Sequence, residues 1–347
     1  MDPYDALDRV VYLLDRSLAD GKRVRAYLRA REIVDEVGHE ELAALHRRGA
    51  LTDLDGIGPS TGAVIADALD GRVPRKLQEL ERTTVLEPTE EGAELRSALR
   101  GDCHLHSLWS DGGASIEQMA RAALALGHEY IVLTDHSPRL TVAHGLNADR
   151  LRAQWEEIGA LNEAATDGFR ILTGIEVDIL ADGSLDQDED LLAQLDVVVA
   201  SVHSKLSMDA KEMTRRMVKA AASPHVDILG HCTGRKVPGR DRPIGRSDFA
   251  GRTGAKFDAD MVFAACQRFD TAVEINCRPE RQDPPDDLLG LALEWDCRIS
   301  IDTDAHAPGQ LEWQVFGCNK AARHGIEPDR IINTWDADTL VEWAASS

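Results

Sequence analysis

The stretch GDCHLHSLWSDGG, residues 101–113, joins a short β-type run to a polar turn. His104 and His106 stand two residues apart, so on a strand both side chains point to the same face. Asp111 follows in an Asp-Gly-Gly turn, just beyond the point where the strand would end. On its own, this pattern more often marks polar side chains at a loop mouth than a metal site. The choice between the two interpretations depends on whether the other predicted strands also end in metal-binding residue types.

Six further β-branched runs follow, and helical segments separate them. They are YIVLTDH (130–136), RILTGIEV (170–177), VVVASVH (197–203), VDILGHC (226–232), TAVEINC (271–277) and RISIDTDAH (298–306). Strands that alternate with helices at this period indicate parallel pairing through crossover helices. Seven such units in succession predict an α/β barrel.

Nearly every one of these runs ends in a residue type that binds metal ions. The candidate ligands are His104, His106, Asp111, His136, Glu176, His203, His231, Asp304 and His306. The carboxyl ends of parallel barrel strands meet at one mouth, where such folds place their chemistry. Six of the twelve histidines fall at these ends, which predicts a multinuclear metal site. A ligand set of nitrogen and oxygen atoms suits zinc, manganese or iron and does not choose among them.

The same residues carry a family resemblance. The motifs HLHSLWSDG, TDHS, GIEVD, SVHS, GHCTGR and DTDAH resemble those of the PHP (polymerase and histidinol phosphatase) family over residues 101–340. The resemblance implies a distorted seven-stranded βα barrel with three divalent metal ions. It assigns His104, His106, Glu176 and Asp304 to the first ion, Glu176, His203 and His231 to the second, and Asp111, His136 and His306 to the third. Some relatives have histidine where Asp111 stands.

The expected chemistry is hydrolysis at phosphorus. Neighbouring divalent cations lower the pKa of a bound water and hold both ends of an in-line displacement. Asp135 is a candidate proton donor or partner of a ligand, and a structural capping role is equally compatible with its position. Lys205, Arg235 and Arg278 follow strand ends and are candidate contacts for the leaving phosphate.

One connection in this region is long for a βα loop. Residues 236–258, KVPGRDRPIGRSDFAGRTGAKFD, are rich in glycine and arginine and poor in aliphatic side chains. Such a composition predicts a mobile, basic, functional loop that sets substrate specificity. The alternative is a disordered surface insertion.

Residues 1–82 show helical periodicity and form an expected all-α domain. LTDLDGIGPSTGAVIADALDG, residues 51–71, has a Gly56-Ile57-Gly58 turn that opens a helix, and its backbone N–H groups could hold a phosphate. With RVRAYLRAREIVDEV before it, this stretch resembles the helix–hairpin–helix domain of X-family DNA polymerases. The candidate DNA-binding residues are Gly56, Gly58, Ser60, Lys22 and Arg25, although basic residues here could equally form a solvated face. The lysine that forms a Schiff base in that family falls on Val64, so we expect a DNA reader and no lyase.

Residues 83–100 look like a linker, and 101–347 form the PHP domain.

Composition narrows the class of protein further. No run approaches the roughly 18 apolar residues of a membrane span, and the acidic N-terminus is no signal peptide, so we expect a cytoplasmic protein. The six cysteines contain no CxxC pair, which argues against a zinc ribbon. The net charge of −22 argues against an extended nucleic-acid-binding face but leaves room for a local basic patch.

These observations favour a metal-dependent phosphoesterase that acts on DNA ends or gapped DNA. The reaction would be 3′-5′ exonuclease or 3′-end processing in DNA repair, although the chain leaves no room for a polymerase domain. The alternative is a phosphatase of phosphorylated small molecules, such as histidinol phosphate or a nucleotide monophosphate. A non-catalytic DNA-end adaptor is the third interpretation, and the complete ligand set argues against it.

Overall fold

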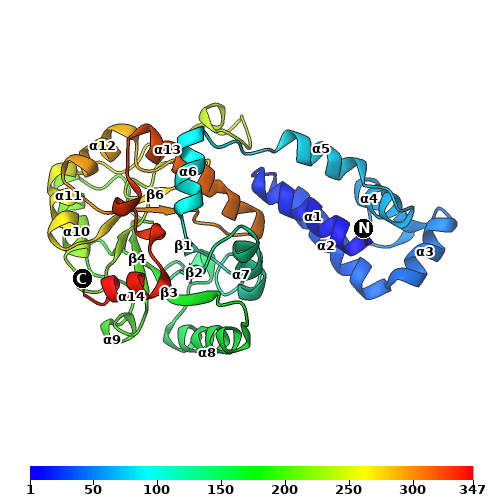
Figure 1. Cartoon of the computed structure of the whole chain (residues 1–347), viewed down its shortest axis with the longest axis horizontal. Coiled ribbons are helices and arrows are strands. Elements are labelled where there is room, and N and C mark those ends of the chain that lie inside the picture. Colours follow the sequence, from blue (N-terminus) through cyan, green and yellow to red (C-terminus); the bar gives the residue numbers. More distant parts are fainter. Residues whose placement is uncertain (347) are drawn as a thin grey trace. The chain divides into compact units, whose positions relative to one another are not determined.

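Seven short parallel strands form the centre of the larger part of the chain (Figure 1). The computed structural model describes residues 1–346. The strands pair strictly in chain order and are β1 Gly101–Leu105, β2 Tyr130–Leu133, β3 Arg170–Asp178, β4 Val197–Ser201, β5 Ile228–Leu229, β6 Ala272–Asn276 and β7 Ile299–Asp302. Nearly every strand residue is buried, as expected for a parallel sheet covered on both faces.

The sheet curls until its two edge strands nearly meet. Leu105 and Ala305 form an isolated parallel bridge, and the N–H of His106 donates to the carbonyl of Ala305 at 2.8 Å. The N–H of Cys103 on β1 donates to the Asp302 carboxylate on β7 at 2.9 Å. The expected α/β fold, a distorted seven-stranded barrel, is confirmed.

Helices and short 3₁₀ turns connect the strands and cover the barrel. The helices are α7 Ile116–Ala125, α8 Ala148–Ala164, α9 Glu189–Leu192, α10 Ala210–Ala221, α11 Ala259–Arg268, α12 Asp286–Glu294, α13 Gln314–Arg323 and α14 Ala337–Ala344. The 3₁₀ turns of the barrel are η2 Thr141–Ala143, η3 Gly239–Asp241, η4 Pro308–Trp313, η5 Pro328–Arg330 and η6 Ile332–Thr334. Because every crossover returns the chain to the same end of the sheet, the carboxyl ends of all the strands face one mouth.

The N-terminal part of the chain is helical, as expected. Its elements are α1 Pro3–Arg16, α2 Gly21–Val37, α3 His39–Arg47, η1 Leu51–Asp53, α4 Pro59–Leu69 and α5 Arg75–Thr83. They enclose an apolar core that includes Leu7, Leu14, Ile33 and Ile65. Residues 1–86 and 243–246 form one compact unit, and the rest of the chain forms the second.

Residues 83–100, which we expected to form a linker, contain a helix in the structure. Helix α6, Glu90–Ala98, occupies half of it and packs in the barrel unit, where the N–H of Thr89 donates to the Asn319 side chain on α13 at 2.8 Å. Asn319 also lies so close to Gly92 that a Cβ there would meet its Oδ1 at 2.1 Å. Part of the expected linker is instead a helix N-cap at Thr89, an acidic first turn and a contact point at Gly92.

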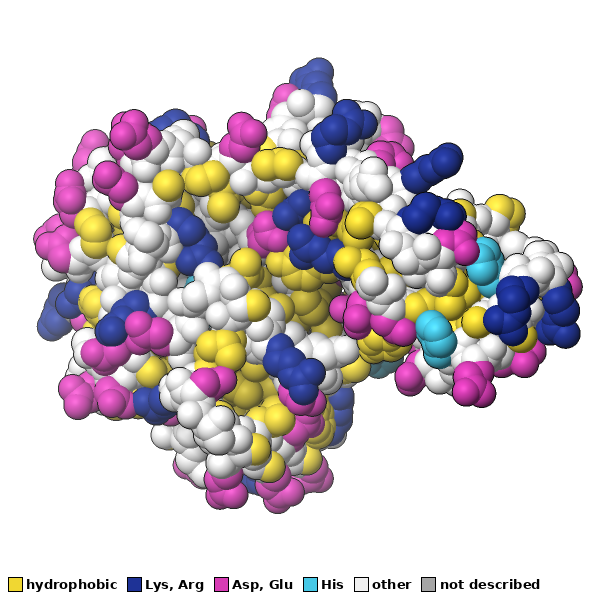
Figure 2. All heavy atoms as spheres, turned by 45° about the vertical axis from the view of Figure 1, so that its right-hand side comes forward, with side chains coloured by type: hydrophobic (Ala, Val, Ile, Leu, Met, Phe, Trp, Pro, Cys, Tyr) yellow, Lys and Arg dark blue, Asp and Glu magenta, His cyan; other side chains and the backbone are white. Residues whose placement is uncertain are grey.

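None of the helices in residues 1–346 combines the length and the apolar character that crossing a membrane requires. The face drawn in Figure 2 mixes acidic and basic side chains. That face shows no continuous basic surface of the kind that an extended nucleic-acid footprint needs.

Candidate metal centre

Glu176 lies at the centre of the barrel mouth. It stands near the end of β3 with a side chain that is 1% exposed. Its Oε1 is 2.9 Å from His231 Nε2 and 3.1 Å from His203 Nε2. Its Oε2 is 3.4 Å from His104 Nε2 and 3.7 Å from His106 Nε2. One carboxylate therefore faces two separate groups of imidazoles, the geometry expected of a bridging ligand.

The other candidate ligands extend this cluster on one side. Asp304 Oδ1 is 3.4 Å from His106 Nε2. Asp111 Oδ1 lies 3.5 Å from His136 Nε2 and 3.3 Å from His306 Nε2. Three sets of potential ligand atoms lie within 4.8 Å of one another, namely His104, His106 and Glu176; His136, Glu176 and His203; and His106, Asp111, His136 and His306. The structure thus brings all nine candidate ligands together.

The backbone at two of these positions is unusual. His231 has φ 21° and Asp304 has φ 51°, positive values that residues other than glycine rarely adopt. Such conformations cost free energy and persist where the surrounding structure enforces them, most often at functional sites. Both residues follow strand ends, so the distortion turns their side chains into the mouth.

The donor atoms fit divalent metal ions. Buried polar atoms nearly always have a hydrogen-bond partner, yet within the described chain His104 Nε2, both ring nitrogens of His106, His203 Nε2 and Glu176 Oε2 have none. Burial raises the pKa of Glu176, but the imidazoles of His203, His104 and His136 outweigh it and hold that pKa well below its usual range. A charged carboxylate among unshared nitrogen lone pairs is a ligand set for cations.

Glu274 on β6 supports this cluster from beneath, and the sequence analysis missed it. His104 Nδ1–H donates to Glu274 Oε1 at 2.6 Å, and the backbone N–H of His231 donates to Glu274 Oε2 at 2.5 Å. The first bond leaves His104 Nε2 free for a metal. Burial raises the pKa of Glu274 to about 7, and His104 opposes the shift. The available signal was a carboxylate in the middle of the apolar run TAVEINC.

Asp135 has the surroundings of a structural cap. It is buried, and its Oδ1 accepts hydrogen bonds from the N–H groups of Ser107 (2.8 Å) and Ser110 (3.1 Å) and from the Ser110 hydroxyl. Its Oδ2 accepts from the Ser107 hydroxyl at 2.6 Å and from Gln154 Nε2 at 2.7 Å. With both oxygens occupied, Asp135 holds the 107–110 turn, which favours the capping alternative over proton donation.

The three candidate phosphate contacts have different surroundings. Arg278 Nη1 lies 3.3 Å from Asp304 Oδ1, and its Nη2 pairs with Glu280 Oε1 at 3.0 Å. Arg235 donates to the carbonyls of Arg281 and Gln282, so its guanidinium holds the loop after β6.

Lys205 is exposed and has φ 54°. Arg281, which the sequence analysis did not single out, has its Nε 3.0 Å from Asp304 Oδ2. It therefore reaches the candidate metal centre directly, whereas Arg235 does not.

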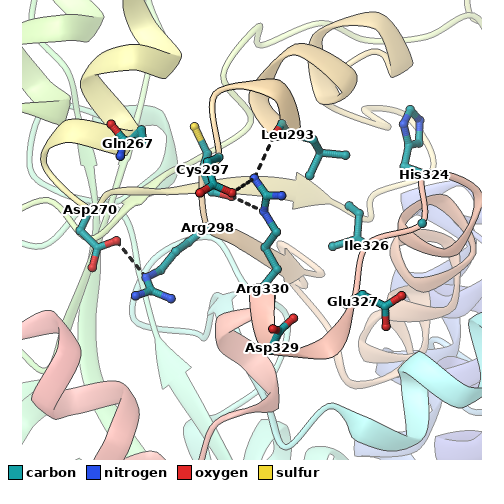
Figure 3. A pocket seen from close by; sticks show the side chains of 12 residues that line it. Gln267, Asp270, Leu293, Cys297, Arg298, His324, Ile326, Glu327, Asp329 and Arg330 are labelled. Carbon is teal, nitrogen blue, oxygen red and sulfur yellow. Dashed lines mark hydrogen bonds and ion pairs between the residues drawn. The ribbon is translucent and has the colours of Figure 1, made fainter.

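A pocket separate from the candidate metal centre lies at the other end of the strands (Figure 3). It has a volume of about 600 Å³ and is lined by residues that precede β6 and β7 and by residues between 324 and 330. Its two arginines are already paired, because Arg298 lies 2.8 Å from Asp270 and Arg330 lies 2.9 Å from Asp296 (Figure 3 draws the first pair). No candidate metal-binding group of the described residues falls in this pocket. The chemistry therefore belongs at the mouth.

Comparison with known proteins agrees with this geometry. Residues 102–212 match the PHP domain family. The chain carries a PHP domain. The match includes six of the nine candidate ligands, from His104 to His203.

Relatives of this chain include one named as a polymerase and exonuclease and several named as probable phosphatases. The DNA polymerase/3′-5′ exonuclease PolX of Bacillus subtilis is 40% identical over 235 residues, which are 68% of this chain and 39% of PolX. The chain therefore spans well under half of that relative. A probable phosphatase of Thermoanaerobacter sp. strain X514 is 29% identical over 248 residues, covering 67% of this chain and 89% of the relative. The chain is thus similar to one relative whose name includes a 3′-5′ exonuclease and to one named a probable phosphatase.

A solved structure is also similar, at a lower level. The histidinol phosphate phosphatase of Lactococcus lactis, in complex with zinc, L-histidinol and phosphate, matches with a TM-score of 0.45 and 19% identity. The match covers 66% of this chain and 94% of that protein. A similarity of this degree does not bear on the substrate.

Proposed function

We propose that this protein hydrolyses phosphoester bonds at nucleic-acid ends, with metal ions held at the barrel mouth and DNA held by the helical unit. The observation that carries the proposal is the presence in one chain of the histidine and carboxylate cluster and a glycine turn that opens helix α4 and resembles a helix–hairpin–helix. The Bacillus PolX, whose name includes a 3′-5′ exonuclease, is consistent with it.

The nine candidate ligands would hold three divalent ions in the groups that the PHP resemblance implies. Glu176 would bridge the ion of His104, His106 and Asp304 to that of His203 and His231, and Asp111, His136 and His306 would hold the third. Bound divalent cations supply a nucleophile at neutral pH and neutralise charge at phosphorus. Glu274 orients the candidate ligand His104, while Arg278 and Arg281 contribute positive charge beside Asp304.

The helical unit has the backbone geometry of a phosphate site. Gly56 has φ +92°, and a Cβ there would meet the Ile33 side chain at 2.7 Å, so only glycine fits this turn. The first helical bond of α4 runs from Gly62 N–H to the Gly58 carbonyl at 2.8 Å, so the N–H of Ser60 precedes it and remains a donor. Gly58 has open space around it. A phosphate could therefore approach this helix N-terminus.

A basic stripe on α2 leads to the same turn. Lys22, Arg25 and Arg29 recur at i, i+3 and i+7, which places them along one face of the helix. Arg29 is the nearest of these three cations to the turn, because its Cγ would lie 3.4 Å from a Cβ on Gly56. Lys22 and Arg25 are exposed and form no side-chain ion pair with another described residue. The Gly58 N–H already donates to Thr61 Oγ1 at 3.0 Å, so these cations support phosphate binding by the Ser60 N–H beside the Gly56 turn.

The test is hydrolysis by purified protein supplied with Mn²⁺ or Zn²⁺. The substrates are 3′-labelled single-stranded and gapped DNA, beside a panel of phosphomonoesters that includes histidinol phosphate and nucleotide monophosphates. We expect nucleotides to be released from the labelled DNA. Rapid hydrolysis of one monoester with intact DNA would contradict the proposal.

That contradicting result would establish the second candidate, a small-molecule phosphatase. Two observations favour it, namely the similarity to a probable phosphatase over 89% of that relative's length and the net charge of −22. An acidic protein lacks the long-range attraction to DNA that basic nucleases have.

A further inference from the structure

The base of the long loop after β5 is anchored on the barrel mouth. The N–H of Val237 donates to the Glu280 carbonyl at 2.8 Å, and the N–H of Ala255 donates to the Thr233 carbonyl at 2.7 Å. Gly251 has φ +83°, and a Cβ there would meet the Lys236 carbonyl at 2.9 Å. The expectation of a mobile loop therefore does not hold for its base, whose backbone has a defined path.

Two cations face each other across this base. Lys236 and Arg252 form an antiparallel bridge and exchange both backbone hydrogen bonds, at 2.9 and 2.6 Å. Directly opposed residues in such a pair carry their side chains on the same face, and like charges there are destabilising. Arg252 Nη2 donates to the Gly234 carbonyl at 2.6 Å, whereas the Lys236 ammonium has no hydrogen-bond or ion-pair partner in the described chain. Neither Lys236 nor Arg252 forms an ion pair with a carboxylate of the described residues.

The half-buried Lys236 precedes Val237, whose N–H donates to the Glu280 carbonyl at 2.8 Å, so it lies beside the segment that carries Arg278 and Arg281. Burial lowers the pKa of Lys236, and Arg281 and Arg278 lower it further, against the opposing effect of Glu280 and Asp304. Glu280 is already paired with Arg278, and Asp304 is a candidate metal ligand that contacts Arg281. Positive charge therefore exceeds the available carboxylates on this side of the mouth.

We propose that Lys236, Arg252 and Arg281 form an anion subsite beside the metal centre, which binds phosphate oxygens of the substrate. The inference rests on the proposed phosphoesterase function and adds residues of the long loop to it. The phosphate could be the one that is cleaved or the next phosphodiester of an oligonucleotide. The chemistry is the same, and the substrates chosen below separate the two sources.

The first measurement is the affinity for inorganic phosphate, determined by titration calorimetry on metal-loaded full-length protein at fixed ionic strength. Lys236→Met should weaken phosphate binding about tenfold, because a hydrogen bond between charged groups is lost. Lys236→Arg should retain most of the affinity. Lys256→Met, which removes the same charge from an exposed position in the same loop, should stay within about twofold of wild type. Equal affinities for Lys236→Met and wild type, or equal losses for the two methionine variants, would overturn the subsite.

The second measurement compares kcat/KM on p-nitrophenyl phosphate and on a 3′-labelled oligonucleotide. A loss for Lys236→Met on both substrates assigns the subsite to the phosphate that is cleaved, and a loss on the oligonucleotide alone assigns it to the neighbouring phosphodiester. No loss on either would refute a role in substrate binding. If wild type cleaves neither substrate, the proposed function fails, while the phosphate titration still decides whether the subsite exists.

Discussion

Both units have an apolar core, but the barrel also buries a cluster of polar ligands that the helical unit lacks among the described residues. In the barrel, charged and polar ligands such as His104 and Glu176 are buried at the strand ends, at 0% and 1% exposure. In the helical unit the interior is apolar, and the polar groups that could bind a phosphate lie on the surface, at Ser60 and along α2. Chemistry at phosphorus needs converging buried ligands, whereas holding a DNA backbone needs only exposed donors.

Val64 on α4 is a buried apolar side chain at the position where the resembled polymerase domain has its Schiff-base lysine. It is 1% exposed and belongs to the apolar core of the helical unit. Schiff-base chemistry requires an accessible amine, and this position offers neither the amine nor the access. Borohydride should therefore not trap the protein on DNA with an abasic 5′ end through this position.

The largest expected effect is that of Glu176→Ala in the barrel. Glu176 touches both groups of imidazoles, so its loss should release at least one metal ion and lower phosphoester hydrolysis by roughly a thousandfold or more. Elemental analysis and a chromogenic phosphoester assay measure the two effects. An active variant with unchanged metal content would remove Glu176 from the centre of the site.

Glu274→Gln should have the next largest effect. The amide no longer stabilises the His104 tautomer as a carboxylate does, so metal affinity should fall about 10- to 100-fold. Competition with a chelator measures that affinity. Glu129→Gln, which breaks only an exposed pair with Arg100, serves as the control and should leave it unchanged.

Ser60→Glu tests the helical unit without touching the barrel. A carboxylate in the first turn of α4 suits the helix dipole, so the fold should remain stable. It should repel a phosphate and weaken binding to gapped DNA about tenfold. Fluorescence anisotropy measures the binding, and Ser60→Gln is the neutral control. If both variants bind DNA as wild type does, phosphate binding at this helix is wrong.

A smaller effect concerns the stability of the barrel. Burial holds the pKa of Asp227 at about 7, against an ordinary value of 3.8, although the Val198 N–H that it accepts at 2.7 Å opposes the shift. The folded state therefore retains this proton longer than the unfolded state. The contribution to stability is complete below pH ~4 and is lost as the pH rises to ~7, by at most about 1.4 kcal/mol per pH unit.

Asp227→Asn should flatten that part of the stability profile. Urea unfolding of metal-free protein at several pH values measures the slope. The control is Asp149→Asn, because the Asp149 side chain is 97% exposed. A wild-type slope in Asp227→Asn would mean that this carboxyl does not titrate in the range.

The sequence signal of the candidate ligands is local. Each one stands at the end of a β-branched run, and the barrel topology then brings all of the ends together. The run at 226–232 proved longer than β5, which ends at Leu229, because the chain leaves the ladder before the unusual backbone of His231. Element type was therefore easier to predict than element length.

Other parts of the site depend on contacts between distant residues. Glu274 lies 170 residues from His104 in sequence, and nothing in either motif indicates that they pair. Asp135 could be assigned only when the Ser107 and Ser110 donors were seen around it. Helix α6 was taken for a linker because its packing partner, Asn319, is equally remote.

The most direct test of the proposed division of labour is the ratio of two rates, cleavage at the 3′ end of gapped DNA and hydrolysis of a chromogenic phosphoester. Wild type, Ser60→Glu and Glu176→Ala would be compared with the same metal. Ser60→Glu should lower the ratio about tenfold while hydrolysis of the small ester stays near wild type, and Glu176→Ala should abolish both activities. Equal loss of both activities in Ser60→Glu, or no DNA cleavage by wild type, would contradict the account.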